Sequence, residues 1–196
     1  MTGRLTTNDR EVIKQLVDLT LLDSIEFDVH SEHWRDLDLS WVPPRLRWHG
    51  ASFVTLERDF QLLGCIGTLQ PHQPLAADIV EHTLAAAYRD PRFRPVTPDD
   101  IHVLDFEVSV LTPLVPIPVE NIDDLTALLR PEIDGLFIES SGHRGTLLPS
   151  VWDDLPTAEE FVAGTWRKAG LQSGDWPHDL EVYTDQVEKI DGRGPR

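Results

Sequence analysis

Two pairs of strands, each joined by a short turn and followed by a helix, are the feature that most constrains this fold. The first pair comprises Ala51–Leu56 and Leu62–Thr68, which are rich in Val, Ile, Phe and Thr. A helix is expected to follow at Leu75–Tyr88, and the second pair comprises Leu136–Glu139 and Thr146–Leu148. Since no regular βαβ alternation appears, we expect an α+β fold with mixed sheets and flanking helices.

Further periodic segments extend this pattern along the chain. A helix is expected over residues 8–22, with Asn8 as its cap, and a strand over Phe106–Leu111. That strand alternates, which places Glu107 and Ser109 together on the face opposite its apolar side chains. Shorter elements are expected at three further places: a helix at Asp123–Leu129, a helix opened by Thr157 and closed by Gly170, and a strand at Leu180–Thr184.

The chain length indicates one domain, or one domain with a small subdomain. A chain of 196 residues suits a single domain, which we expect to be structured over residues 8–190. Residues 191–196 are expected to form a flexible tail. Between Ser24 and Gly50 the pattern is irregular, and Trp34, Trp41 and Trp48 are expected to pin this long loop onto the core.

Charge and cysteine content exclude several classes of partner. The net charge of −17, without any run of Lys or Arg, argues against nucleic acid and against anionic membrane surfaces. No apolar run approaches the roughly 18 residues that a membrane helix needs. A single cysteine cannot form an internal disulfide, and no signal peptide is evident, so a cytoplasmic location is expected.

Cys65 lies in the segment Gly64-Cys65-Ile66-Gly67 and is the leading candidate for chemistry. Glycines on both sides allow close backbone approach around the thiol. A reactive role requires a thiolate, which nearby cations or a helix N-terminus would favour. The alternative is a small buried apolar residue in a central strand.

Three further side chains are candidates for a site. His143 and Arg144 are the best local cations, in a turn bounded by Gly142 and Gly145 that would approach a ligand closely. The alternative there is a hairpin turn with a solvated arginine. Glu107, if buried, would be a general acid or base with a raised pKa; otherwise it lies on the solvent face of a half-buried strand.

A metal site has little support in the sequence. The closest cluster is His30-x-x-His33, with Asp28 and Glu32 nearby, and it lacks a second pair of ligands. We therefore assign no metal site. Nucleotide-binding and serine-hydrolase motifs are absent, so neither function is supported, and the identity of any cofactor stays unknown.

Short motifs follow one another along residues 50–190 of the chain. The first are Phe53-Val54-Thr55-Leu56 and Gly64-Cys65-Ile66-Gly67-Thr68-Leu69. The others, in order, are Pro74-Leu75, Ala85-Ala86-Ala87, Asp90-Pro91-Arg92-Phe93, Glu107-Val108-Ser109-Val110-Leu111, Gly135-Leu136, Gly142-His143-Arg144-Gly145, Leu147-Leu148-Pro149 and Lys168-Ala169-Gly170-Leu171. This ordered set resembles the AMMECR domain family, also named AmmeMemoRadiSam system protein A.

The resemblance implies a larger and a smaller lobe with a cleft between them, lined by the segment around Cys65. On this basis Cys65 and Glu107 are the candidate catalytic residues. The candidate ligand-binding residues are Gly64, Gly67, Thr68, Ser109, His143 and Arg144. The resemblance also implies an association with a Memo-like protein and a radical S-adenosylmethionine protein, and it carries no established reaction.

The sequence departs from the family pattern beside the cysteine. Leu63 stands where the family typically has Arg, and Phe60 stands in a turn where it often has Gly. His82-Thr83 replaces the usual Asn-Ala, and Ser150 replaces Gln. Losing the arginine removes the obvious cation next to Cys65.

Two kinds of function remain open on the sequence alone. The first is an enzyme or small-ligand-binding protein in which His143 and Arg144 hold an anionic group beside Cys65. The second is a non-catalytic adaptor that works with the Memo-like or radical-enzyme partners.

Overall fold

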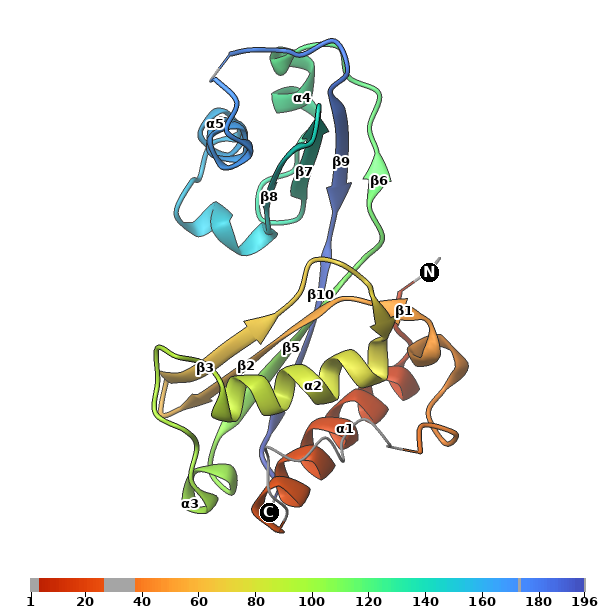
Figure 1. The fold of residues 1–196 in the computed structure, drawn as a ribbon, viewed down its shortest axis with the longest axis vertical. Coiled ribbons are helices and arrows are strands. Elements are labelled where there is room, and N and C mark those ends of the chain that lie inside the picture. Colours follow the sequence, from red (N-terminus) through yellow and green to blue (C-terminus); the bar gives the residue numbers. More distant parts are fainter. Residues whose placement is uncertain (1–3, 27–37, 173, 196) are drawn as a thin grey trace. The chain divides into compact units, whose positions relative to one another are not determined.

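The structure is a computed structural model that describes residues 4–26, 38–172 and 174–195. The chain divides into two compact units (Figure 1). The first unit comprises Met1–Leu111 and Glu188–Arg196, and the second comprises Thr112–Val187. Helices and strands occur in both units, so the α+β class expected from the sequence is confirmed.

The first unit is built on a four-stranded sheet in the order β10-β5-β2-β3. β2 pairs antiparallel with β3 on one side and with β5 on the other. The strands are β2 (Ser52–Arg58), β3 (Gln61–Gly67), β5 (Asp105–Leu111) and β10 (Val187–Arg193). The first three lie where the sequence places them. β3 is an edge of this sheet, which leaves the outer side of Cys65 without a neighbouring strand.

Helices cover one face of this sheet (Figure 1). They are α1 (Thr7–Glu26), α2 (Leu75–Tyr88) and the short α3 (Pro98–Ile101). α2 packs on β2 and β3, and α1 packs against α2. α2 has the predicted bounds, but α1 begins one residue earlier than expected. Its cap is Thr6, whose Oγ1 accepts a hydrogen bond from the Asp9 N–H at 3.1 Å. The Thr6 N–H in turn donates to the Asp9 carboxylate at 2.9 Å. The expectation that Asn8 is the cap is therefore wrong.

The segment before β2 contains small elements that do not depend on tryptophan packing. They are η2 (Pro44–Arg47) and β1 (His49–Gly50), which pairs with β4 (Gln73–Pro74) from the segment after β3. Trp41 and Trp48 are 46% and 55% exposed, whereas Val42 and Leu46 are fully buried. The expectation that the tryptophans pin this loop onto the core is therefore wrong for these two, because branched aliphatic side chains fill the space. Trp34 lies outside the described residues.

The C-terminal segment is ordered within the first unit, unlike the tail expected from the sequence. β10 continues to Arg193 and Ile190 is buried in the core. The N–H of Gly194 then donates to the Leu104 carbonyl at 2.8 Å. A sequence rich in charge and interrupted by Gly192 hides this strand, because its stability comes from pairing with residues far away in the chain.

The second unit contains a sheet in the order β6-β9-β7-β8, with α5 packed on β7 and β8. Its elements are β6 (Val115–Pro116), α4 (Ile122–Leu128), β7 (Gly135–Ser140), β8 (His143–Leu147), η3 (Pro149–Asp153), α5 (Ala158–Ala169) and β9 (Glu181–Asp185). Its core includes Trp152 stacked on Phe161, with ring centroids 3.9 Å apart. α5 begins with a capping box of Thr157 and Glu160 and ends at left-handed Gly170, as predicted.

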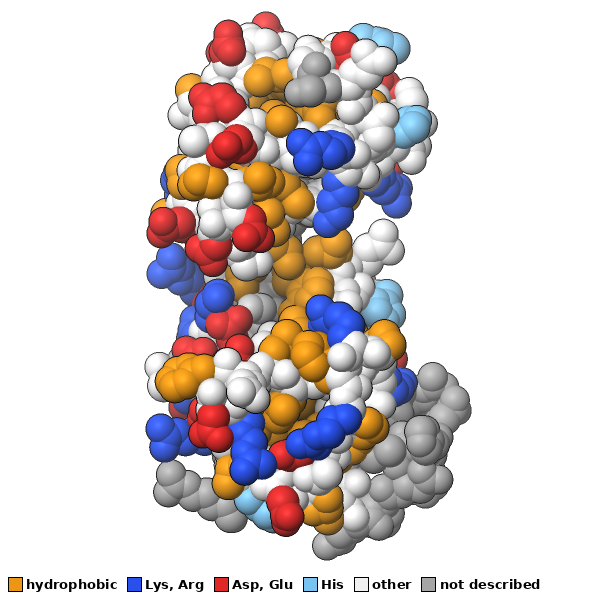
Figure 2. Space-filling view, turned by 90° about the vertical axis from the view of Figure 1, so that its left-hand side faces the viewer, with side chains coloured by type: hydrophobic (Ala, Val, Ile, Leu, Met, Phe, Trp, Pro, Cys, Tyr) orange, Lys and Arg blue, Asp and Glu red, His pale blue; other side chains and the backbone are white. Residues whose placement is uncertain are grey.

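The molecular surface mixes charges of both signs. On the side shown in Figure 2, Lys and Arg side chains alternate with Asp and Glu side chains, and apolar side chains lie between them. The net charge of −17 is therefore not gathered into one acidic patch on this side. In the described part of the chain, every helix is too short or too polar to cross a membrane.

Candidate functional site

The candidate site lies on the face of the first sheet opposite the helices. Val54 and Leu56 point toward the helices and are fully buried, so Thr55 between them points to the opposite face. Thr55 is paired with Cys65 on β3 and with Glu107 on β5. The three side chains therefore form one row across neighbouring strands. The register thus brings together the two candidate catalytic residues expected from the sequence.

Cys65 is a half-exposed thiol with a hydrogen-bond donor beside it. The Oγ1 of Thr55 donates to its Sγ at 3.2 Å. This bond holds the Thr55 hydroxyl against the sulfur on the open face. Cys65 is half-buried, so the structure does not show the fully buried cysteine of the alternative interpretation, and its role stays a prediction.

Asp90 and Arg92 occupy the free edge of β3 at Cys65. The Cys65 N–H donates to Asp90 Oδ2 at 2.9 Å, and the Cys65 carbonyl accepts from Arg92 Nη2 at 2.9 Å. The two side chains also pair with each other, since Arg92 Nε and Nη2 donate to the Asp90 carboxylate at 2.9 and 2.7 Å. Together they satisfy the peptide groups that an additional strand would otherwise bind.

Asp90 and Arg92 stabilise each other's charged forms. The hydrogen bonds from Arg92, helped by the Cys65 and Arg92 N–H groups, outweigh burial and hold the pKa of Asp90 well below its usual range. The pKa of Arg92 is raised, first by Asp90 and to a smaller extent by the charge of Cys65 when it is ionised. Arg92 is therefore a permanent cation beside the thiol.

Glu107 lies in the row without being buried. Its side chain is 30% exposed and its Oε2 is 3.1 Å from Lys189 Nζ. Ser109 Oγ donates to its Oε1 at 2.9 Å. Of the two alternatives for Glu107, the structure therefore shows the half-exposed face, and burial does not supply a proton donor. The arrangement suits a hydrogen-bond acceptor or a base.

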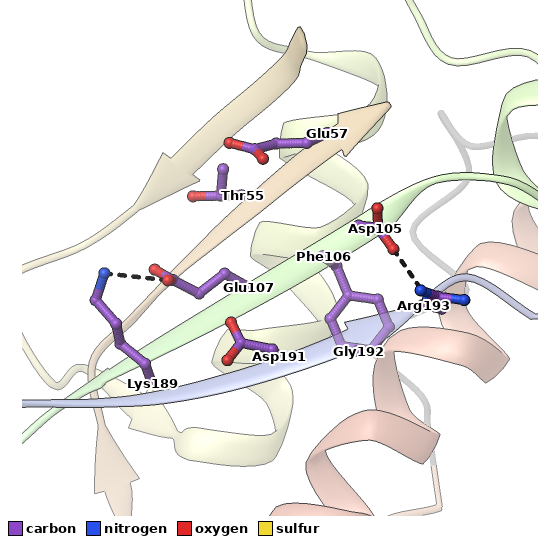
Figure 3. A pocket seen from close by; sticks show the side chains of 9 residues that line it. All are labelled: Thr55, Glu57, Asp105, Phe106, Glu107, Lys189, Asp191, Gly192 and Arg193. Carbon is purple, nitrogen blue, oxygen red and sulfur yellow. Dashed lines mark ion pairs between the residues drawn. The ribbon is translucent and has the colours of Figure 1, made fainter. Parts of the chain in front are cut away.

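A groove of about 580 Å³ lies beside this row (Figure 3). It is lined by Thr55, Glu57, Asp105, Phe106, Glu107, Lys189, Asp191, Gly192 and Arg193. Figure 3 shows the ion pairs of Lys189 with Glu107 and of Arg193 with Asp105, the latter at 3.5 Å. Since four acids outnumber two bases in this lining, the groove favours the cationic or hydrogen-bond-donating part of a ligand. An anionic group suits the Arg92 end of the row better.

The family model named AMMECR1 matches residues 20–190 of the chain. The chain belongs to the AMMECR1 family. A relative from Methanothermobacter thermautotrophicus is 44% identical over 154 residues, which cover 75% of this chain and 78% of the relative. A relative from Thermofilum pendens is 34% identical over 202 residues, which cover 95% of this chain and 91% of the relative.

A solved AMMECR1-like structure has the same fold. The crystal structure of an uncharacterized protein from Pyrococcus horikoshii aligns with a TM-score of 0.71 and 28% sequence identity, covering 98% of this chain and 99% of that one. The names of these relatives state no reaction, substrate or partner. Membership of the AMMECR1 family therefore fixes the fold and leaves the chemistry to be argued from the site.

The glycines around Cys65 have packing roles in this AMMECR1-family chain. A Cβ on Gly64 would lie 2.0 Å from the Ala86 carbonyl oxygen of α2, and a Cβ on Gly67 would lie 2.3 Å from the Phe53 ring. Gly64 therefore permits α2 to approach the edge strand closely. Thr68, the other residue of this segment expected to bind ligand, is half-exposed, and its N–H donates to the Ser52 carbonyl at 3.1 Å.

Leu63 stands at an irregularity of the β2–β3 pairing. The pairing passes from Leu56 with Gly64 to Glu57 with Leu62, so Leu63 is the unpaired residue of a bulge. Leu63 packs against the hydrophobic core of the first unit. Leu63 therefore supplies no cation beside Cys65 in this chain. Arg92 has that place.

His143 and Arg144 lie in the second unit and have partners there. The His143 ring contacts the Ala169 carbonyl at the end of α5 at 3.1 Å, and Arg144 Nη2 donates to Glu139 at 2.8 Å. Both residues lie on β8, since the turn before them is short. Gly145 is buried, and a Cβ there would lie 2.4 Å from the Thr165 carbonyl oxygen. The expectation that Gly145 allows a loop to approach a ligand is wrong. The missing side chain of Gly145 instead allows α5 to pack closely on β8.

Sequence reasoning missed Arg92, Asp90 and Lys189 as parts of the site. Asp90 and Arg92 belong to one of the short motifs on which the family resemblance rests, and this motif could have indicated them. Lys189 lies on the unforeseen strand β10 and gave no signal. His30 and His33 lie outside the described residues. Among residues 4–26, 38–172 and 174–195, no group of three or more His, Cys, Asp and Glu side chains is placed to hold a metal.

Proposed function

We propose that this AMMECR1-family protein binds a small molecule on the open face of its first sheet, as an enzyme or an enzyme component. Cys65 contacts or attacks the ligand as a thiolate, and Glu107 accepts a proton or a hydrogen bond from it. The observation that carries this proposal is the row of Cys65, Thr55 and Glu107 across three neighbouring strands.

The spacing of the row decides what Glu107 acts on. Cys65 and Glu107 are two strands apart, which places their Cα atoms about 10 Å from each other at the usual strand spacing. This distance is too long for Glu107 to take the proton of the thiol directly. It suits a small molecule that spans the row and contacts both side chains. Thr55 and Arg92 are then the polar side chains nearest to Cys65 that the ligand would meet.

The charges around the row suggest the polarity of the ligand. An anionic group, as expected from the sequence, would lie beside Arg92. Amino or hydroxyl groups would lie toward the acidic groove, where Glu57 and Asp191 offer carboxylates. A small molecule with a carboxylate or phosphate at one end and donors at the other fits both.

Retention of a metabolite tests this function. After incubation with a metabolite extract and gel filtration, native mass spectrometry of the wild-type protein should reveal a bound small molecule. The Glu107→Gln variant should retain about tenfold less, because a charged hydrogen-bond partner contributes about 1.5–3 kcal/mol. Cys65→Ser should also retain less. Equal retention by wild type and both variants would contradict the proposal, and Glu159→Gln, a change on the exposed start of α5, serves as the control.

The second candidate function is an adaptor for Memo-like and radical S-adenosylmethionine proteins, the association that the family resemblance implies. The observation in its favour is Phe60, a fully exposed aromatic at the tip of the β2–β3 turn. Its φ of 62° is unfavourable for a side chain of this size, and it packs on nothing that would explain it. If no metabolite is retained while a purified Memo-like protein co-elutes with the chain, the adaptor function replaces the first.

A further inference from the structure

The chain passes between its two units at residues 111–112 and again at 187–188. Thr112 and Gln186, which lie beside these two crossings, are hydrogen-bonded to each other. The Thr112 N–H donates to the Gln186 carbonyl at 2.8 Å, and the Gln186 N–H donates to Thr112 Oγ1 at 2.8 Å. We call this reciprocal pair the Thr112–Gln186 clasp. It joins the segments by which the chain enters and leaves the second unit.

The clasp is attached to a buried carboxylate. Gln186 Nε2 donates to Asp134 Oδ1 at 3.2 Å. Asp134 is 3% exposed and accepts from Arg130 through its Nε at 2.9 Å and its Nη2 at 2.6 Å. Burial opposes the charge of Asp134, but the hydrogen bonds from Arg130 and Gln186, together with the charge of Arg130, outweigh it and lower the pKa of this carboxyl. Asp134 is therefore a fixed anion behind the clasp.

Asp185, the residue before Gln186, carries a second carboxyl group that lacks such support. Asp185 is 4% exposed, and its Oδ1 is buried without a hydrogen-bond partner in the described part of the chain. It is paired with Gly135, where a Cβ would lie 2.3 Å from this oxygen, so the carboxyl group lies directly on the Gly135 backbone.

Burial, together with the charge of Asp134, raises the pKa of Asp185 to about 6 despite an opposing backbone hydrogen bond. The charged groups that bear on it are Asp134 and, paired with Asp134, Arg130.

We propose that Asp185 makes the Thr112–Gln186 clasp pH-sensitive, closed when Asp185 is protonated and weakened when it is ionised. An ionised Asp185 is an uncompensated buried charge beside a second carboxylate, and opening the clasp allows it to reach water. The pKa of Asp185 in the closed clasp lies above its ordinary value of 3.8. The stability that protonated Asp185 gives to the closed clasp is therefore fully present below pH 3.8 and is lost as the pH rises through about 6.

Hydrogen exchange of the Thr112 and Gln186 amides tests this proposal in the full chain. After correction for the intrinsic pH dependence of exchange, protection of both amides should fall by up to about 100-fold between pH 4 and pH 7, since two pKa units correspond to this factor. In Asp185→Asn, protection should not change with pH. Asp153→Asn, which removes an exposed carboxylate of the same unit, should behave as the wild type.

Two outcomes would overturn the proposal. One is protection that stays constant with pH in the wild type, and the other is an unchanged fall in Asp185→Asn. If Asp185→Asn does not fold, the carboxyl carbon chemical shift of Asp185 in the wild type decides instead. A titration midpoint near 6 supports the proposal, and a midpoint near 4 contradicts it.

Discussion

Replacing Gly64 by alanine is expected to destabilise the first unit by about 3 kcal/mol or more, at the upper end of the range for overpacked cores. The added Cβ would lie 2.0 Å from the Ala86 carbonyl oxygen and 2.9 Å from its carbonyl carbon. Both are backbone atoms of α2, so no side chain can rotate away, and β3 and α2 must separate. The lower entropy of the unfolded alanine variant offsets only about 0.4–1 kcal/mol of this.

Urea unfolding measures this effect, and Gly142→Ala is the matched control. Gly142 has a φ of 83° and nothing within 4 Å of its Cβ position, so alanine there has a conformational penalty alone, of about 1–2 kcal/mol. If Gly64→Ala were no more destabilising than Gly142→Ala, the close approach of α2 to the strand that carries Cys65 would be wrong.

Replacing Asp100 by alanine is expected to destabilise the first unit by about 2–3 kcal/mol at neutral pH. Breaking an ion pair between two buried groups would cost more, but the arginine partners of Asp100 are exposed. Asp100 is 1% exposed, and its carboxylate accepts from Arg58 at 2.8 Å and from Arg94 at 2.8 Å. It also closes the capping box with Thr97 at the start of α3. Its loss therefore removes two charge-assisted bonds and a helix cap together.

The effect of Asp100 should depend on pH in a defined direction. The hydrogen bond from Arg94, together with those from Thr97 and Arg58, outweighs burial and lowers the pKa of Asp100 below the ordinary value of 3.8. The stability from Asp100 is therefore present above pH 3.8 and is lost as the pH falls through the folded value.

Thermal unfolding of wild type and Asp100→Ala should accordingly converge in acid. Asp99→Ala is the control, since Asp99 lies in the same turn but is exposed. It should change stability by only about 0.5 kcal/mol. A difference between wild type and Asp100→Ala that grows toward low pH would contradict the assignment.

Local patterns predicted much of the fold. The apolar spacing of Leu75–Tyr88 predicted the bounds of α2 to the residue. Alternation in Phe106–Leu111 placed Glu107 and Ser109 on one face, because strand periodicity alone decides which side chains share a face. Thr157 and Gly170 bounded α5 by capping chemistry that acts within one turn of the helix.

The rest of the site depends on contacts between distant segments. Arg92 reaches the Cys65 carbonyl across 27 positions of the chain, and Lys189 reaches Glu107 from a strand whose own sequence is mostly polar. No local periodicity encodes such contacts. The prediction for Trp41 and Trp48 failed for another reason. Their size suggested that they pack on the core, but the smaller neighbours Val42 and Leu46 fill that space.

The central claim is that Cys65 is an accessible, reactive thiol beside Thr55 and Arg92. Because Cys65 is the one cysteine of the chain, its alkylation rate with iodoacetamide at pH 7 reports on this site alone. The folded protein should react faster than the urea-unfolded chain. Arg92→Ala should slow the reaction about threefold, as expected for an exposed cation that contributes up to about 1 kcal/mol.

Arg89→Ala serves as the control, since Arg89 is exposed and its guanidinium donates to the Glu81 carbonyl instead. This variant should react like the wild type. A folded protein that reacts more slowly than the unfolded chain, together with no effect of Arg92→Ala, would contradict the claim and leave Cys65 a structural residue of β3.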